Sequence, residues 1–410
     1  MRDLVPPEAG LRRALGRTIA DVFASFGYAP VSTPPFELES VIARALEGVD
    51  GRELMRFVDA ETGDVVMLRP DITPQIARVV ASRLPDRPPP LRLSYEGHVV
   101  RRRRGRARTQ RQIAQAGVEC IGVAEIHADV EVIELASRAL RAAGLSAHRI
   151  ELNLTPLTGA LFERVDSDLR PDARAALAQK DGASLDRLLR GAPREVLRGV
   201  RAALDLIGDH GVLARARRLF DDHDSRAHID ELDAIHTALQ GLDLAVPIGF
   251  DLGEPRGFGY YTGASFAILA EGPGEPVAVG GRYDDLLGRF GRAMPATGVA
   301  IDLDHLDWAL GARATVASGA ETYVIAGACT PQLCAVLRAV GVAAAALPGA
   351  SLDDARAYAA SWEHAGVVIV DGARATLHAG DGASERVRVS DLPARLATGS
   401  TARRSVRTKR

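Results

Sequence analysis

Cysteine is scarce in this 410-residue chain, which contains only Cys120, Cys329 and Cys334. These residues form no CxxC pair and no other spacing typical of zinc ligands. Few and scattered thiols are typical of a reducing compartment. We therefore expect a cytoplasmic protein that holds no metal.

Long apolar runs are missing as well. Residues 1–15 lack the apolar core of a secretion signal. The alanine-rich stretch 334–348 is too short to cross a bilayer and contains Arg338. We expect neither a secretion leader nor a membrane span.

The chain has no excess of one charge sign. Its net charge is −2, and its 47% hydrophobic and 25% charged residues are ordinary for a globular protein. This balance disfavours a nucleic-acid-binding protein, which normally presents a broad basic face. Glycine-rich nucleotide loops are also lacking, because segment 280–291 does not follow GxxxxGK[ST] and no GxGxxG opens a helix after a strand. The length suggests two or three domains.

Positive charge does gather in segment 91–122. An alternating apolar run enters this segment, a basic tip interrupts it and a second alternating run leaves it, which predicts a long antiparallel β-hairpin. A charge block of this density is usually a solvated loop. The arginines at or beside the tip are Arg101, Arg102, Arg103, Arg104, Arg106, Arg108 and Arg111.

The strand that leaves the hairpin carries two polar residues on one face. Gln115 and Glu119 are four residues apart, so both side chains point the same way. An amide beside a carboxylate can bind an ammonium or imidazole group. The alternative is that the two side chains only brace a buried hairpin.

Two helices are predicted before the hairpin. Apolar spacing predicts a helix over 8–27 that ends at its last glycine. Thr73 is the expected N-cap of a second helix that runs to Leu84. Asp71 then falls at a strand-to-helix junction, where it either caps the helix or faces a site.

Segment 158–245 is predicted to be a helical insertion, because short amphipathic stretches replace the alternating pattern there. Its histidines include His223, His228 and His236. They lack the spacing of a HExxH motif, so we expect them at the surface and not at a metal.

Strands resume after the insertion. Segments 246–253 and 253–271 are expected to be antiparallel neighbours, and Gly280–Gly281 to open a turn into a short helix. Alternating strands and helices then predict a small α/β domain over 320–398. The basic tail 399–410 is expected to be disordered.

Several blocks resemble the histidyl-tRNA synthetase family of class II synthetases. FGYAPVSTPP resembles motif 1, with Pro34 at the motif proline of the dimer interface, and segment 95–122 resembles motif 2. GGRYDDLLGRFG with PATGVAIDLDHL resembles motif 3, and RGFGYYTG resembles the histidine-specific block. The resemblance implies an α+β fold with an antiparallel sheet flanked by helices over 1–315. It also implies that the C-terminal α/β domain is a shortened anticodon-binding domain.

The nucleotide half of the site departs from the family pattern. Arg101 matches the arginine that grips the α-phosphate and the amino-acid carboxylate. Arg103 replaces a glutamate that accepts a hydrogen bond from adenine, and arginine has no acceptor. His305 replaces an arginine that stacks on the base, and histidine is shorter and mostly neutral at pH 7. The resemblance thus implies a degenerate ATP site at Arg103 and His305.

The histidine half of the site is better kept. Asp71 is a shorter acid than the family's glutamate, and Phe258 and Gly259 replace a Leu-Asp pair, but the remaining contacts match. The resemblance therefore implies histidine-binding residues at Asp71, Thr73, Arg101, Gln115, Glu119, Arg256, Tyr260 and Tyr261.

A site that keeps amino-acid contacts and loses nucleotide contacts suits a sensor. The chain resembles more closely the non-aminoacylating branch of the family, the regulatory subunits of ATP phosphoribosyltransferase. This implies a non-catalytic protein without cofactors, acting in the first step of histidine biosynthesis. Its expected partners are the catalytic subunit of that enzyme, histidine as feedback effector, and a second copy of itself within a hetero-oligomer.

Two alternatives remain. The chain could be a working histidyl-tRNA synthetase that tolerates Arg103 and His305. It could instead be a stand-alone binding paralogue that touches RNA through the arginine tip.

Overall fold

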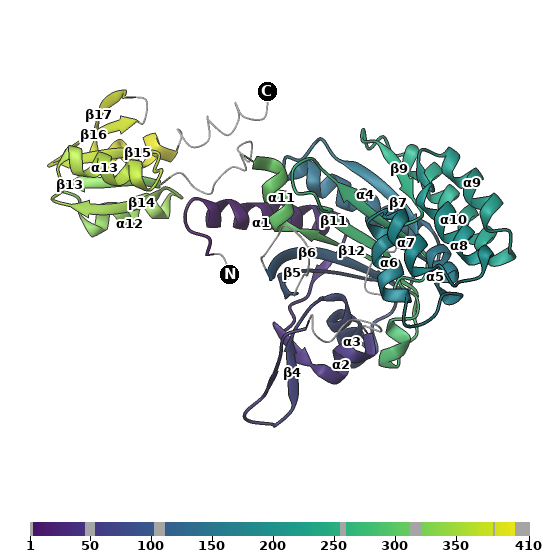
Figure 1. Ribbon diagram of the computed structural model, residues 1–410. Helices are drawn as coiled ribbons and strands as arrows, with labels where there is room; N and C mark the ends of the chain where they lie inside the picture. The colour runs from purple at the N-terminus through teal and green to yellow at the C-terminus, as the bar shows by residue number, and fades with distance from the viewer. Residues whose placement is uncertain are drawn as a thin grey trace. The chain divides into compact units, whose positions relative to one another are not determined.

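The structure is a computed structural model, shown in Figure 1. No helix among the residues it describes is both long and apolar enough to span a membrane. The described residues are 3–45, 54–101, 111–254, 260–311, 322–379 and 382–397.

The chain divides into two compact units. The larger unit comprises Leu15–Ala314 with Met1–Arg2. The smaller unit comprises Thr315–Arg410 with Asp3–Ala14. Tail residues 399–410, for which we predicted disorder, lie outside the described residues.

A nine-stranded sheet lies at the centre of the larger unit, in the order β1-β5-β6-β12-β11-β10-β7-β9-β8. Every pair from β5 to β7 in this order is antiparallel, whereas β1 and β9 run parallel to β5 and β7. The strands are β1 (Ala29–Pro30), β5 (Leu91–Val100), β6 (Gln112–Ile121), β7 (Arg149–Leu154), β8 (Ile207–Gly208), β9 (Ile248–Asp251), β10 (Ala264–Leu269), β11 (Ala278–Arg282) and β12 (Ala296–Asp302).

The predicted hairpin is confirmed, because β5 and β6 pair antiparallel from Leu91 opposite Ile121 to Val100 opposite Gln112. Residues 102–110 of its tip lie outside the described residues. The register sets Glu119 of β6 opposite Gly298 of the next strand, β12. Directly opposed residues share a face of a sheet, so β5, β6 and β12 together supply one side of the site.

Helices cover this sheet. Helix α4 (His127–Ala142) packs on β10, β11 and β12, and α11 (Leu303–Leu310) packs on β6. Helix α1 (Glu8–Ser25) agrees with the helix predicted over 8–27. Gly27, which follows it, has φ +83°, a left-handed value that glycine adopts at low cost and that ends helices.

A second, three-stranded sheet precedes the hairpin in the chain, in the order β2-β4-β3. It is antiparallel throughout, and helix α2 packs on it and on α3. The elements are β2 (Phe36–Leu38), α2 (Glu39–Ala45), β3 (Arg56–Val58), β4 (Val65–Leu68) and α3 (Thr73–Arg83).

The prediction that Thr73 caps α3 was wrong. Ile72 occupies the N-cap position, and its side chain makes no capping hydrogen bond. The Thr73 hydroxyl instead donates to Oε1 of Glu119 at 2.6 Å. The Thr73 hydroxyl therefore binds Glu119, which is distant in the sequence, and does not cap the helix.

The insertion is helical, as predicted, and its helices enclose a hydrophobic cluster of their own. The prediction of surface histidines was wrong for His236, which is buried because the helix that carries it packs against Phe250 of β9. The insertion helices are α5 (Thr155–Glu163), α6 (Arg170–Ala178), α7 (Gly182–Leu188), α8 (Arg194–Leu204), α9 (Gly211–Leu219) and α10 (His223–Gln240).

Two strand predictions after the insertion were also wrong. Strand β9 is not a neighbour of β10, because β7 lies between them and pairs with both. Gly280–Gly281 do not open a turn but lie inside β11. A Cβ added at Gly280 would collide with the backbone of Gly298 on β12, so the glycine serves close strand packing.

The smaller unit contains a five-stranded sheet in the order β14-β13-β15-β16-β17. The strands β14, β13 and β15 are parallel, as expected for the predicted α/β domain, and β16 and β17 add an antiparallel edge. Its elements are β13 (Thr322–Gly327), α12 (Pro331–Ala339), β14 (Ala343–Pro348), α13 (Leu352–Ser361), β15 (Gly366–Asp371), β16 (Arg374–Ala379) and β17 (Ser384–Arg388).

A buried ion pair ties the central sheet to α4. Arg282 of β11 donates from Nε to Oδ2 of Asp129 at 3.0 Å, and both side chains are only 4% exposed. The guanidinium also donates to the carbonyl oxygens of Val123 and Glu125. A second carboxylate, that of Asp284, lies 3.3 Å from Arg282 Nη1 but is 41% exposed, so Asp129 is the buried counter-charge of Arg282.

We expect Asp129→Asn to lower the free energy of unfolding by up to about 3–5 kcal/mol, because it leaves the buried Arg282 with only the part-exposed Asp284 as counter-charge. The matched control is Glu195→Gln, which breaks the exposed pair with Arg164 and should cost at most about 1 kcal/mol. Urea denaturation of both variants measures the difference. Equal losses would show that the Arg282 pair adds nothing beyond a surface contact.

Candidate functional site

The side of the site formed by the sheet is built around glycines that make room for polar side chains. Glu119 of β6 lies opposite Gly298, and a Cβ at Gly298 would collide with the Glu119 carboxylate. Gly117, two residues earlier, leaves space for the ring of Tyr95 on β5. Any side chain at Gly298 would therefore displace Glu119.

The N-terminal end of α3 forms the opposite side. Asp71 and Thr73 are both buried there. Oδ1 of Asp71 accepts the backbone N–H of Ile72 at 2.7 Å, and the Thr73 hydroxyl donates to Glu119. One oxygen of Asp71 therefore binds the backbone at the start of α3, while the role of Asp71 in a ligand site stays a prediction.

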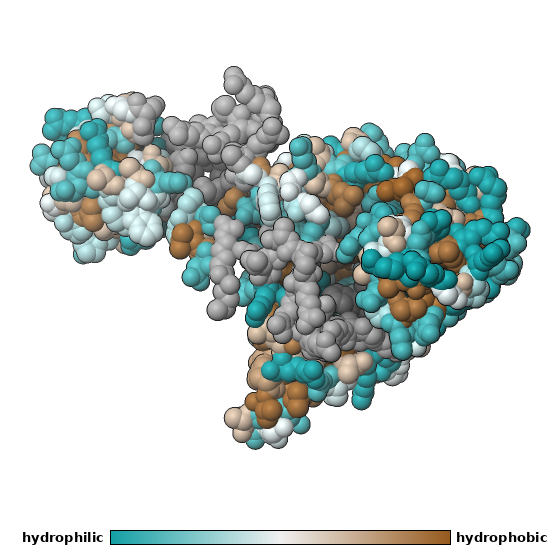
Figure 2. Space-filling view, in the orientation of Figure 1, coloured by the Kyte–Doolittle hydropathy of each residue, from teal (hydrophilic) through white to brown (hydrophobic). Residues whose placement is uncertain are grey.

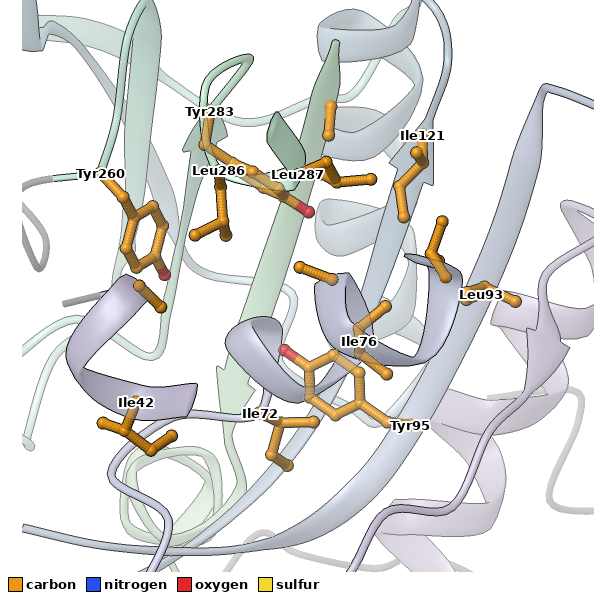
Figure 3. Packing of buried hydrophobic residues seen from close by; sticks show 14 of the residues in the cluster. Ile42, Ile72, Ile76, Leu93, Tyr95, Ile121, Tyr260, Tyr283, Leu286 and Leu287 are labelled. Carbon is orange, nitrogen blue, oxygen red and sulfur yellow. The ribbon is translucent and has the colours of Figure 1, made fainter. Parts of the chain in front are cut away.

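Tyrosines close the space between these two sides. Tyr260 donates its hydroxyl to Oδ2 of Asp71 at 2.8 Å, and Tyr283 donates to Oε2 of Glu119. The rings of Tyr260 and Tyr283 meet edge to face, with centroids 5.7 Å apart. In Figure 3 the hydroxyl groups of Tyr95, Tyr260 and Tyr283 turn toward one central region beside Ile72 and Ile76 of α3.

The sequence analysis missed Tyr95 and Tyr283. Tyr283 lies in the glycine-rich block that resembled motif 3. The glycines of that block suggested a phosphate loop, and the tyrosine between them was not predicted to be a site residue. Tyr95 pairs with Gly117, and Gly97 pairs with Gln115, so Tyr95 and Gln115 lie on the same face of the hairpin. This shared face could have identified Tyr95 from the sequence.

Burial dominates the electrostatics of the site. Glu119 is 1% exposed, and burial raises its pKa to about 8, helped by the nearby charge of Asp71. Burial also raises the pKa values of Tyr260 and Tyr283 well above the usual range. Burial thus favours the protonated form of Glu119 near neutral pH, whereas its hydroxyl donors Thr73 and Tyr283 favour the carboxylate.

Two polar atoms of the site have no partner among the described residues. Oε1 of Gln115 and the hydroxyl of Tyr95 are buried and form no hydrogen bond with them. The described donors to Asp71 and Glu119 are hydroxyl and backbone N–H groups and include no ammonium or guanidinium. The site thus presents acceptors suited to a ligand that carries positive charge and several N–H groups.

Two other predicted residues border this space. Arg101 donates from Nε to the carbonyl oxygen of Pro70 at 2.5 Å, next to Asp71 in the chain. Tyr261 packs beside Tyr260, and burial raises the pKa of Tyr261 while the charge of Arg101 partly offsets the rise. Arg256, also predicted here, lies outside the described residues, as does Arg103 of the nucleotide half.

His305 is turned into the protein. It is 2% exposed, and its Nδ1 donates to the carbonyl oxygen of Pro276 at 2.8 Å. The carboxylates of Glu275 and Asp302 lie 3.9 and 3.3 Å from its ring nitrogens. A ring held in this way offers no open face on which a nucleotide base could stack.

With this geometry described, the chain can be compared with known proteins. The family model for histidyl-tRNA synthetase matches residues 1–306. The ATP phosphoribosyltransferase regulatory subunit of Anaeromyxobacter dehalogenans strain 2CP-1 is 40% identical over 316 residues, 76% of this chain and 90% of that protein. The chain belongs to the family of ATP phosphoribosyltransferase regulatory subunits, which share the histidyl-tRNA synthetase fold.

Other members of this family give the same result. The regulatory subunit of Moorella thermoacetica is 38% identical over 334 residues, 79% of this chain and 84% of that protein. A Bacillus halodurans crystal structure, described as an ATP phosphoribosyltransferase regulatory subunit/histidyl-tRNA synthetase, superposes with a TM-score of 0.77 at 27% identity. It covers 91% of this chain and 97% of that one. The predicted resemblance and the class II synthetase-like fold are confirmed.

The raised pKa of Glu119 makes a testable contribution to stability. Its ordinary pKa is 4.5 and its folded value is about 8, so between these limits the folded state holds a proton that the unfolded state releases. Stability must therefore fall as pH rises, by up to roughly 1.4 kcal/mol per pH unit from this group.

We expect Glu119→Gln to remove this pH dependence. In urea denaturation at pH 6 and pH 8, the wild-type free energy of unfolding should fall by about 1–3 kcal/mol more than that of the variant. All other titrating groups contribute equally to both proteins and cancel in the comparison. Parallel pH profiles would mean that Glu119 is already ionised at pH 6.

Proposed function

We propose that this chain regulates a separate catalytic subunit of ATP phosphoribosyltransferase and that histidine is its effector. Histidine would bind between β6 and α3, against the residues predicted from sequence. The observation that carries the proposal is the buried pair of carboxylates, Asp71 and Glu119, with the amide oxygen of Gln115, unpaired among the described residues, on the same face of β6 as Glu119. The relatives in the family, which are regulatory subunits, support the regulatory role.

The chemistry of this site suits a cationic amino acid. An ammonium group supplies three donors, and an imidazole supplies one N–H donor and one acceptor. Binding of a cation would release the proton from Glu119 and replace a costly buried acid with a charge-assisted hydrogen bond. Arg101, at the edge of the site, would meet the carboxylate of the ligand.

Feedback requires histidine to bind the inhibited arrangement of the complex more tightly than the active one. Couplings of this kind typically amount to about 1–3 kcal/mol. Histidine would then inhibit the catalytic partner without contacting its substrates.

We also propose that the chain does not catalyse a reaction itself. The buried His305 and the predicted role of Arg103 both favour a disabled nucleotide site. The competing function is a working histidyl-tRNA synthetase. ATP–pyrophosphate exchange separates the two, because robust histidine-dependent exchange would require an intact ATP site and would refute the regulatory proposal.

The central experiment is reconstitution with the catalytic subunit. We expect this chain to raise the activity of the catalytic subunit and to make that activity sensitive to histidine. Activity that is unchanged by this chain, or insensitive to histidine in its presence, would contradict the proposal. A cytoplasmic location belongs to the same proposal.

Gly298→Ala tests the site, because Gly298 leaves the space that the Glu119 carboxylate occupies. We expect histidine affinity, measured by calorimetry, to fall at least about tenfold because the new methyl group displaces the carboxylate. Gly159→Ala is the matched control, since the space around Gly159 in α5 is open. Glu119→Gln, which keeps the shape of the side chain, should reproduce the loss if Gly298→Ala disturbs folding. Unchanged affinity in Glu119→Gln would remove Glu119 from the site.

A second copy of the chain belongs to the proposal as well. The three-stranded sheet exposes apolar side chains, and Figure 2 shows them as a brown region at the lower end of the larger unit. Exposed apolar side chains gathered in one place mark an interface. Phe36, Leu38 and Phe57, 41% to 46% exposed, share one face of this sheet, and Val58 and Val65 lie on its other face.

We expect Phe57→Asp to convert a dimer of this chain to monomers, because it places a charge in the apolar contact. Light scattering after size exclusion gives the mass. Val336→Asp, at a similarly exposed position on α12, should leave the mass unchanged. A wild-type monomer, or a variant dimer, would exclude this surface as the interface.

A further inference from the structure

The helical insertion contains a cluster of metal-ligand side chains that the proposed function does not use. His210 lies at the start of α9, and Asp233 and His236 are three residues apart on α10. Residues at this spacing share one face of a helix. Their ligand atoms all lie within 4.8 Å of one another.

His236 carries the inference. Its side chain is 5% exposed, but its ring nitrogens are not sealed from solvent, and they form no hydrogen bond with any described residue. They are therefore open to a ligand. The ring stacks on His210 with centroids 5.1 Å apart and lies 5.1 Å from the ring of Phe250, which fixes its position beside the cluster.

The surroundings of Asp233 orient it. Arg217 donates to Oδ2 of Asp233 at 2.9 Å and to Oδ1 of Asp230 at 2.7 Å. Oδ1 of Asp233 is left facing the histidines, and Nε2 of His210 donates to it at 2.7 Å. The two carboxylates outweigh the one guanidinium, so the cluster keeps a net negative charge.

We propose that His210, Asp233 and His236 bind a divalent transition-metal ion of the zinc class. Two imidazoles and one carboxylate are a ligand set that such ions favour, with a fourth position left for water. His210 is 56% exposed, so its side chain can turn and the ion can enter from solvent. The bound ion would cross-link α9 to α10, which packs on β9 through His236.

A second acidic group in the described residues is a poorer candidate. Glu151, Asp251 and Glu254 also bring their oxygens together, but Nζ of Lys180 already neutralises Asp251 at 2.6 Å. No histidine takes part there. The cluster on α9 and α10 is therefore the one we assign.

The test is calorimetric titration of the full chain with Zn²⁺ after removal of metal by a chelator. We expect wild type to bind one more ion than His210→Ala, or to bind that ion at least about tenfold more tightly. His210 is exposed, so its removal should not disturb folding. The matched control is His228→Ala on α10, outside the cluster, which should bind like wild type.

A spectroscopic readout separates this site from binding at cysteines. Co²⁺ bound by nitrogen and oxygen lacks the intense thiolate charge-transfer band that Cys329 or Cys334 would give. Equal stoichiometry and affinity in wild type and His210→Ala, or a thiolate band that accounts for all bound Co²⁺, would overturn the proposal.

Discussion

The burial of two carboxylates beneath a single helix end is the constraint on which much of the larger unit depends. Asp71 and Glu119 would destabilise an apolar interior if they were left without donors. Three hydroxyl groups and the backbone at the start of α3 provide those donors, from three separate stretches of chain. The glycines of β6 and β12 follow from the same constraint, because any side chain at Gly298 would occupy the space of the Glu119 carboxylate. The fold and the site are therefore specified by the same residues.

The positions that match the two halves of a synthetase site are packed differently. Those of the amino-acid half place acceptors and rings around a buried space. In the nucleotide half, His305 lies in the interior, where the Pro276 carbonyl holds its ring. Under the proposed function, this fold supplies a frame in which one small ligand favours one arrangement of a complex over another.

Much of the larger unit was predictable from sequence, because the spacing of apolar residues and the positions of glycine and proline are local signals. The alternation in 91–122 gave the hairpin and placed Gln115 and Glu119 on one face, and the sheet register agrees. The failures all involve contacts between distant residues. The Thr73 hydroxyl binds an acceptor 46 positions away and does not cap its helix. Strand β7 lies between β9 and β10, which follow each other in the chain. The burial of His236 likewise depends on a strand outside the insertion. The domain limits and the histidine-binding assignments stay predictions.

The parallel pairing of β7 with β9 has a consequence for how this family can vary. Parallel neighbours cannot be joined by a tight turn and need a crossover of a dozen residues or more. The helices from α5 to α10 are that crossover, so the insertion is the obligatory return path of the chain and not an addition to a finished sheet. Such a connection can lengthen at small entropic cost, but it cannot shrink to a hairpin without releasing β9 from the sheet. Evolution can thus remodel the surface of this segment freely, provided that a path across the sheet remains.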